Sequence, residues 1–303
     1  MPPYISVIIP TFNRAEKLIK CLACLKNQTL AREAFEVIVI NDGSTDGTEA
    51  LLKTWQKNSQ KSNFNLKFST QKNSGQGTAR NKGIKEAGGL ITLFIGDDIY
   101  AKPNLLELHT VFHKKHPEEN MACLGLIEWT PTPPPTPFMH WLTHGGPQFA
   151  YDLLTDKAEA DFWFFYTSNI SLKTGLLRKE HFDPDFKSYG WEDTELAYRL
   201  VHAHNLKILF NKDALAFHDH IVSEDSLKNR MMGIGKNAVI FQKKHPKLPV
   251  VPQGLKLAAL KILSSLPALL ILKVARTLSP NRLGKYYWYS LSKRYFLKGL
   301  KSL

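Results

Sequence analysis

The sequence has few cysteines: three among 303 residues, Cys21, Cys24 and Cys123. Three thiols cannot build a disulfide framework, which excludes the small secreted domains that depend on one. The first residues also lack the basic, apolar and small-residue succession of a secretory signal, so we expect a reducing, cytoplasmic setting. Because Cys21 and Cys24 lie in the helical pattern EKLIKCLACLKNQ without a second cysteine pair, we expect them to pack rather than bind metal.

Acidic residues are missing from the last quarter of the chain, where none follows Asp225. The segment Ser226–Leu303 holds 16 Lys and Arg, whereas the first 225 residues hold 24 basic and 27 acidic residues and are close to neutral. The formal net charge of +13 is therefore a property of the tail. A basic tail can bind nucleic acid or anionic lipid, and the residues between its charges decide between the two.

The tail also lacks an apolar run long enough to cross a membrane. Its apolar stretch at 262–272 is broken by two serines and a proline and is bounded by Lys261 and Lys273. A spanning helix needs about 20 apolar residues, whereas a helix lying in the interface uses an apolar face and basic flanks. Aromatic residues at Tyr286–Tyr289 beside further lysines suit headgroup depth. We expect residues 223–303 to form a basic amphipathic helical extension that associates with an anionic membrane surface; packing on the preceding domain or a partner chain is the alternative.

Short β-branched runs alternate with helical patterns in the first half of the chain. This alternation predicts an α/β fold with a Rossmann-like, mostly parallel sheet flanked by helices. The expected strands are ISVIIP, FEVIVI, LKFST, LITLFI, Met121–Trp129 and segments near LKILF and ALAF. The expected helices are Glu16–Asn27, Thr48–Lys57, Gly77–Ala87, one opened by Pro103, Trp191–His204, and one capped by Ser223 that runs to about Lys244.

The run TPTPPPTP cannot form regular structure and is either a loop near a cleft or a spacer. We expect the α/β domain to occupy residues 1–222, in two halves at 1–100 and 101–222.

Polar residues follow three of the predicted strands, at the sheet edge where open α/β sheets bind ligands. The segments are PTFNR after the first strand, NDGSTDG after the second and GDD after the fourth. Turn formation alone accounts for any one of them. Adjacent Asp97 and Asp98 after a wholly apolar strand suit Mg²⁺ or Mn²⁺, which bind carboxylate oxygens and bridge to phosphate.

Five motifs occur in order between about Ile5 and His220: SVIIPTFNR, VIVINDGSTDGT, NSGQGTARNKGI, LFIGDD and YGWEDTELAYRL. Together they resemble the family 2 glycosyltransferases, which have the GT-A fold. The resemblance implies a metal-dependent, inverting hexosyltransferase that moves a sugar from a nucleotide-diphosphate donor to a hydroxyl of a glycan or lipid-linked saccharide. It also implies a role in cell-envelope polysaccharide synthesis, at the inner face of the membrane.

The resemblance assigns nucleotide-sugar binding to the loops after the first two strands and to the glycine-rich segment. The Asp42 carboxylate can accept a uracil-like N–H, which favours a UDP-sugar. The Arg80 guanidinium matches phosphate or ribose oxygens, and its presence breaks the GxGxxG spacing of a dinucleotide fingerprint. The assigned residues are Pro10, Thr11, Asn13, Arg14, Asp42, Gly77, Arg80 and Asp97.

The resemblance places a divalent metal, Mn²⁺ or Mg²⁺, on Asp98. The family's D-x-D motif aligns with Gly96, Asp97 and Asp98, so glycine stands where the first acid is expected. His218 and His220 are implied as further metal or diphosphate ligands, with an ordinary surface pair as the alternative. A metal here would stabilise the charge of the departing nucleoside diphosphate.

The element Trp191-Glu192-Asp193 matches the position of the family's general base. An acceptor hydroxyl becomes a good nucleophile only as its proton is removed, and a positioned carboxylate can do this. The resemblance implies Asp193 as the base and Glu192 as the alternative, while a favourable charge at a helix N-terminus explains the pair without catalysis. The segment Thr167-Ser168-Asn169 is a further candidate lining for the sugar pocket.

Two functions of other classes explain parts of the sequence. A sugar-1-phosphate nucleotidylyltransferase would also have an α/β nucleotide domain and metal-binding acids. Its glycine-rich basic loop belongs near the first strand, where this chain has PTFNRAEK. A protein that binds nucleic acid or an anionic surface accounts for the tail but not for Asp98 and Asp193, and we expect no nucleic-acid partner.

Overall fold

The computed structural model describes residues 2–61 and 63–302, which form two compact units. The first unit comprises the residues up to 130 together with 153–187 and 192–220. The second comprises 131–152, 188–191 and the residues from 221 onward. The second unit thus includes 131–152, 188–191 and residues 221 and 222, all within the range 1–222 that was predicted as one domain.

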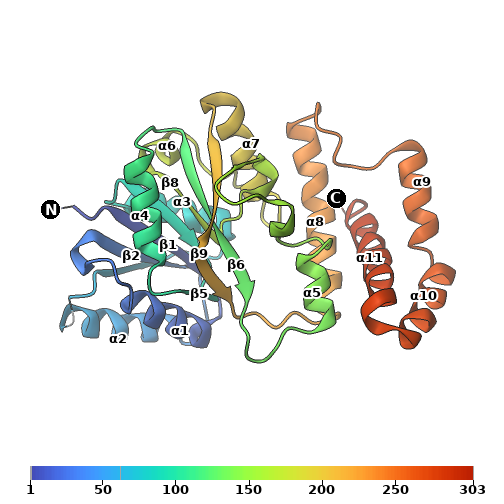
Figure 1. The fold of residues 1–303 in the computed structure, drawn as a ribbon, viewed down its shortest axis with the longest axis horizontal. Helices are drawn as coiled ribbons and strands as arrows, with labels where there is room; N and C mark the ends of the chain where they lie inside the picture. The colour runs from blue at the N-terminus through green and yellow to red at the C-terminus, as the bar shows by residue number, and fades with distance from the viewer. Residues whose placement is uncertain (1, 62, 303) are drawn as a thin grey trace. The chain divides into compact units, whose positions relative to one another are not determined.

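A nine-stranded sheet forms the centre of the first unit in the described residues (Figure 1). Its order is β3-β2-β1-β4-β8-β6-β9-β5, and β7 pairs with β9. Neighbouring strands among β3, β2, β1 and β4 are parallel, whereas β8 is antiparallel to both β4 and β6. The strands are β1 (Ile5–Thr11), β2 (Phe35–Asn41), β3 (Leu66–Thr70), β4 (Ile91–Ile95), β5 (Ile99–Ala101), β6 (Met121–Trp129), β7 (Glu159–Ala160), β8 (Asn169–Lys173) and β9 (Lys207–His218).

The five strands expected from β1 to β4 and at β6 are confirmed, and the segments near LKILF and ALAF form one strand, β9. Strand β8, NISLK, was not predicted, and its antiparallel direction makes the second half of the sheet mixed rather than parallel. Three of its five residues are polar, so β8 lacks the apolar run by which the other strands were recognised. These polar residues are buried because α4 supplies their partners: His109 Nδ1 lies 2.7 Å from Ser171 Oγ, and Lys173 Nζ lies 3.1 Å from His113 Nδ1.

Helices cover the sheet of the first unit, and most begin and end close to their predicted bounds (Figure 1). They are α1 (Ala15–Lys26), α2 (Thr48–Lys61), α3 (Gln76–Glu86), α4 (Leu105–Lys115), α6 (Thr174–Lys179) and α7 (Glu192–His204), with 3₁₀ turns at Arg32–Ala34 and Phe162–Phe164.

Three predicted helix starts need correction. Pro103 precedes α4 rather than opening it, because Asn104 is the residue at the N-cap. Trp191 precedes α7, since its φ of 78° is not helical. The helix predicted to be capped by Ser223 begins at Ser226 after Asp225, although the Ser226 amide still donates to Ser223 Oγ at 3.4 Å.

The second unit is helical and is organised around α11 (Pro280–Gly299), which contacts its other helices (Figure 1). These are α5 (Pro137–Thr143), which follows the proline-rich loop, α8 (Ser226–Lys244), α9 (Gly254–Leu263) and α10 (Leu266–Leu278). Buried Trp288 of α11 packs on Phe138 and Trp141 of α5, with ring centroids 5.5 and 6.0 Å apart.

Helices α8 and α11 approach closely at glycine. A Cβ added at Gly235 would lie 2.3 Å from the Phe296 carbonyl oxygen, and one at Gly299 would lie 2.2 Å from that of Met232. Among the described residues, no single helix is both long and apolar enough for a membrane span; α9 and α10 reach that composition only as a pair bent by 52°.

Candidate active site

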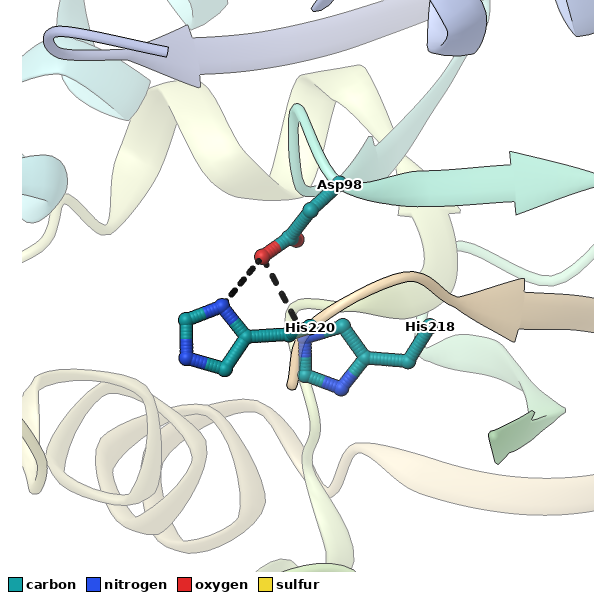
Figure 2. A group of neighbouring side chains, drawn as sticks. All are labelled: Asp98, His218 and His220. Carbon is teal, nitrogen blue, oxygen red and sulfur yellow. Dashed lines mark hydrogen bonds and ion pairs between the residues drawn. The ribbon is translucent and has the colours of Figure 1, made fainter. Parts of the chain in front are cut away.

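A carboxylate and two imidazoles meet at one edge of the sheet in the first unit (Figure 2). Asp98 Oδ2 lies 3.3 Å from His218 Nε2 and 3.5 Å from His220 Nδ1. Asp98 lies in the turn between β4 and β5, and the histidines lie at and just beyond the end of β9. Because β5 pairs with β9, with Ile99 opposite His218, residues 120 positions apart come together.

Contacts around this cluster hold the two histidines in place. The Trp129 ring stacks on His218 at 5.1 Å, and His218 and His220 stack at 5.5 Å. Asp219 Oδ2, between them in sequence, accepts from Tyr100 OH at 2.6 Å and from Lys17 Nζ at 2.7 Å. These supporting contacts were not predicted; the one sequence signal for Asp219 is its place between two histidines in FHDH.

The three donor atoms fit a divalent cation, because they lie within 4.8 Å of one another. One carboxylate oxygen and two imidazole nitrogens make a mixed set that transition metals such as Mn²⁺ accept, whereas Mg²⁺ prefers oxygen. Burial by itself raises the pKa of Asp98, but His218, His220 and Arg14 outweigh it and hold that pKa well below its ordinary value. The carboxylate is therefore ionised and ready to bind a cation.

Glycine at position 96, where the family motif has an acid, has a steric reason. A Cβ at Gly96 would lie 2.9 Å from Asp98 Oδ1 and 3.3 Å from Ile99 Cγ1. A side chain there would disturb the Asp98 carboxylate in its present orientation. The chain thus lacks the first acid of the motif but has two histidines beside the last.

Asp97, the neighbour of Asp98 in the chain, is hydrogen-bonded to residues at and after the end of β1. Its Oδ2 accepts from Thr11 Oγ1 at 2.7 Å, and its Oδ1 lies 3.3 Å from Arg14 Nη1. Burial and the neighbouring Asp98 charge raise the pKa of Asp97 to about 6. Arg14 Nη1 also donates to Asp98 Oδ2 at 2.6 Å. Thr11, Arg14 and Asp97 therefore share one polar network with the cation cluster.

Two other residues assigned to nucleotide binding organise the neighbouring loops. Asn13, which has a φ of 52°, accepts from the Thr45 amide at 2.7 Å and so ties the loop after β1 to the loop after β2. Asp42 is buried and accepts from the Gly75 amide at 2.9 Å, with further bonds from Ser74 and Gln71. Pro10 lies in β1 opposite Ile40, at the same edge.

Glu192 lies inside the protein beside α3. It is buried, and its Oε1 accepts from Gln76 Nε2 and lies 3.4 Å from Arg80 Nη1. Gly77 makes room for this arrangement, since a Cβ there would lie 3.3 Å from Phe182 Cβ and 3.8 Å from Glu192 Cγ. Burial, aided by the Asp193 charge, raises the pKa of Glu192 to about 7. Arg80 is equally buried, so the structure pairs it with Glu192, and its contact with phosphate stays a prediction.

Asp193 is more accessible than Glu192, being half-buried at the first turn of α7. Its Oδ1 accepts from the Thr194 amide at 2.9 Å, and the nearby Thr167 backbone lowers its pKa. Burial raises its pKa despite the nearby Arg80. Thr167 precedes β8, whose Asn169 pairs with Ile95 at the end of β4. Asp193 and the Asp98 cluster therefore lie at the same edge of the sheet.

Asn169, considered for the sugar pocket, lies in the core instead. It is fully buried, its Nδ2 donates to the Ala214 carbonyl at 2.8 Å, and its Oδ1 lies 3.0 Å from His109 Nε2. These bonds join β8 to β9 and α4. The position therefore supports the sheet, while the backbone of Thr167 lowers the pKa of Asp193.

Comparisons with known proteins show which proteins the chain resembles. Residues 6–152 match the model of glycosyl transferase family 2. The chain is 29% identical over 270 residues to a validoxylamine A glucosyltransferase of Streptomyces hygroscopicus subsp. jinggangensis, a match that covers 81% of this chain and 62% of that relative. It is 25% identical over 288 residues to the chondroitin synthase of Escherichia coli, covering 85% of this chain and 40% of that protein.

Solved structures share the fold. The mannosyltransferase PcManGT of Pyrobaculum calidifontis, in complex with GDP-Man and Mn²⁺, superposes with a TM-score of 0.67 at 19% identity and covers 99% of this chain and 86% of its own. TarS of S. aureus with UDP-GlcNAc superposes with a TM-score of 0.56 at 19% identity, over 99% and 91% of the two chains. Residues 6–152, which carry Asp42 and Asp98, thus resemble glycosyl transferase family 2, and the chain has the GT-A fold.

Proposed function

We propose that this chain transfers a sugar, with inversion, from a nucleotide-diphosphate donor to a hydroxyl of a glycan or lipid-linked saccharide. The observation that carries the proposal is the placement of two chemically distinct groups at one sheet edge: the cation cluster of Asp98, His218 and His220, and the half-buried Asp193. Each group suits one half of the reaction. The cluster faces the departing diphosphate, and the carboxylate activates the acceptor.

In this proposal Asp193 is the general base. The hydrogen bond from the Thr194 amide orients the carboxylate, and its raised pKa makes it a better proton acceptor than an ordinary aspartate. It removes the acceptor hydroxyl proton as that oxygen attacks the anomeric carbon from the face opposite the leaving diphosphate. A single displacement of this kind inverts the anomeric configuration.

Asp98, His218 and His220 would hold the divalent metal, which supplies positive charge against the diphosphate when bound. The mixed oxygen and nitrogen donor set supports Mn²⁺ in preference to Mg²⁺. Arg14 lies within reach of this position and is free to offer its guanidinium to a phosphate oxygen once a cation takes over the neutralisation of Asp98.

We favour a UDP-sugar as the donor. Buried Asp42 lies beside the loop after β1 and beside the N-terminus of α3, and a carboxylate oxygen can accept the N3–H of uracil. TarS was solved with UDP-GlcNAc and PcManGT with GDP-Man, so both bases occur on this fold. The nucleotidylyltransferase alternative has no matching observation, since the loop after β1 supplies Asn13 and Arg14 instead of a glycine-rich basic loop.

The test begins by identifying the donor as the nucleotide sugar that raises the melting temperature in the presence of Mn²⁺. Turnover at saturating donor is then compared with a separate titration of Mn²⁺ and nucleoside diphosphate. Asp193→Asn keeps the size of the side chain but cannot accept a proton, so we expect transfer to fall about 10²- to 10⁴-fold with nucleotide affinity close to wild type.

Glu192→Gln is the matched control. Because Glu192 is buried against Gln76 and Arg80, we expect this variant to keep most of its chemical rate. If Asp193→Asn stays active and Glu192→Gln is dead, the base is Glu192. If both variants stay active, the assignment of a base to this element is wrong.

A further inference from the structure

The outer sides of α9 and α10 in the second unit expose a continuous set of large apolar side chains. Leu255 is 90% exposed and Leu278 is 82% exposed, values that are unusual for leucine in a folded protein. We call this set the outer apolar face. It comprises Leu255, Ile262, Leu263, Leu266, Leu270, Ile271, Val274 and Leu278.

Helical spacing places these residues on one side of each helix. In α9, Leu255 and Ile262 recur at i and i+7, with exposed Ala258 and Ala259 between them. In α10, Leu266, Leu270 and Val274 recur at intervals of four. Residues at these intervals share one helix face. The outer apolar face is therefore an ordered surface of two helices rather than a scatter of single exposed residues.

The opposite side of α10 is anchored within the second unit. Leu269 is buried, and Arg276 Nη1 pairs with Glu224 Oε1 at 2.8 Å, where Trp288 Nε1 of α11 also donates at 2.9 Å. Both helices contact α11 (Figure 1). Helix α10 therefore has one side that packs within the second unit and an opposite side that is apolar and exposed. A helix that lies on a membrane surface has the same two sides.

Basic residues border the outer apolar face. Exposed Lys256 and Lys261 flank it on α9, and exposed Lys273 flanks it on α10. The whole second unit holds 16 Lys and Arg against three Asp and Glu, and one of those acids, Glu224, is paired with Arg276. The first unit holds 24 basic and 24 acidic residues. The positive charge is therefore concentrated on the unit that carries the exposed apolar surface.

We infer that the outer apolar face of α9 and α10 docks onto the surface of an anionic lipid bilayer, with both helices lying in the interface. The apolar side chains enter the boundary between headgroups and acyl chains, and the flanking lysines contact anionic headgroups. A lipid surface is favoured over nucleic acid, because phosphate recognition by nucleic-acid-binding proteins does not use a broad aliphatic face. This inference does not rest on the proposed catalytic activity.

The test measures binding of the full chain to vesicles of phosphatidylcholine and phosphatidylglycerol at a ratio of 7:3, by co-sedimentation. The variant replaces four exposed residues, Ile262→Asn, Leu266→Asn, Leu270→Asn and Val274→Asn. We expect its partition coefficient to fall by about 100-fold or more, because each side chain loses apolar area buried in the membrane. The control places asparagine at Leu90, Val111 and Leu153, which are exposed on the first unit, and should bind like wild type.

A second set of variants keeps the test informative if the first fails to fold. Lys256→Gln, Lys261→Gln and Lys273→Gln together should weaken binding to the anionic vesicles about tenfold or more while leaving weak binding to pure phosphatidylcholine unchanged. Alkaline carbonate should release the bound wild-type protein.

Four results overturn the inference. In the first, both sets of variants bind vesicles like wild type. In the second, the asparagine variant changes from dimer to monomer in sedimentation velocity without a change in vesicle binding, which assigns the face to a second copy of the chain. In the third, the lysines are needed for RNA but not for vesicles. In the fourth, carbonate fails to release the protein, which means that the helices cross the bilayer.

Discussion

Arg14 Nη1 lies 2.6 Å from Asp98 Oδ2, so the carboxylate at the centre of the candidate metal cluster is already paired with a cation from its own chain. Arg14 is substantially exposed at this point, whereas Asp98 is buried. The pairing neutralises a charge that burial would otherwise destabilise. A metal ion at the cluster therefore competes with Arg14 for Asp98.

This competition predicts opposite effects of Arg14→Gln on two binding events. Mn²⁺ alone should bind about three- to tenfold more tightly, because the variant lacks the positive charge beside the ligand. A nucleoside diphosphate with saturating Mn²⁺ should bind more weakly, since the guanidinium is no longer available to phosphate. Calorimetry measures both affinities, and Lys53→Gln, which removes an exposed charge on α2, serves as the control. Equal changes of the same sign would contradict this account of Arg14.

Metal preference follows from the two imidazoles. We expect His218→Ala to weaken Mn²⁺ binding by about tenfold or more, with a smaller effect on Mg²⁺, because Mg²⁺ depends chiefly on oxygen ligands. Chelation with EDTA should abolish the metal-dependent part of nucleotide binding in the wild type. Titrations followed by electron paramagnetic resonance report Mn²⁺ directly. A variant that binds Mn²⁺ as tightly as wild type would remove His218 from the ligand set.

The free energy of unfolding should depend on pH because of Glu192. Burial and the Asp193 charge raise its pKa from 4.5 to about 7 in the folded protein, so the folded chain holds a proton that the unfolded chain releases. Its contribution to stability is fully present below pH 4.5 and is lost as the pH rises through about 7. We expect Glu192→Gln to reduce the fall in the free energy of unfolding between pH 5 and 7.5, measured by urea denaturation. Identical pH slopes in both proteins would contradict this role.

Two glycines of α8 should respond to alanine with opposite signs. Gly235→Ala places a Cβ 2.3 Å from the Phe296 carbonyl oxygen and should destabilise the protein by about 1–3 kcal/mol, because α8 and α11 must separate. The nearest atom to a Cβ at Gly233 is the Tyr189 amide nitrogen at 3.5 Å, so Gly233→Ala should stabilise by about 0.5–1 kcal/mol through helix propensity. Thermal melts compare the two, and equal melting temperatures would exclude a tight crossing at Gly235.

Local patterns were sufficient for most of the first unit. The strands β1, β2 and β4 were predictable because they are mostly apolar and bounded by turn residues, whereas β3 (LKFST) alternates apolar and polar residues. The carboxyl ends of β1, β2 and β4 share one edge because these strands are parallel. That rule predicts from the sequence alone that Thr11, Asp42 and Asp98 lie at one edge of the sheet. The excess of basic residues in the tail was also predictable from the sequence, because composition does not depend on folding.

Other features depend on contacts between distant residues, and the tertiary structure alone decided them. The strand β8 escaped prediction because Asn169, Ser171 and Lys173 find buried partners on α4 and neighbouring strands, which no local pattern records. Glycine at position 96 is explained only by the position of the Asp98 carboxylate.

The assignment of the general base to Glu192 or to Asp193 also depends on both the sequence and the tertiary structure. The sequence determined that two carboxylates begin a helix, but not which one stays accessible. The fold places Glu192 against Gln76 and Arg80 of α3 and leaves Asp193 half-buried beside the Thr167 amide. Successive side chains of a helix point about 100° apart, so packing on one side buries the first and leaves the second partly exposed.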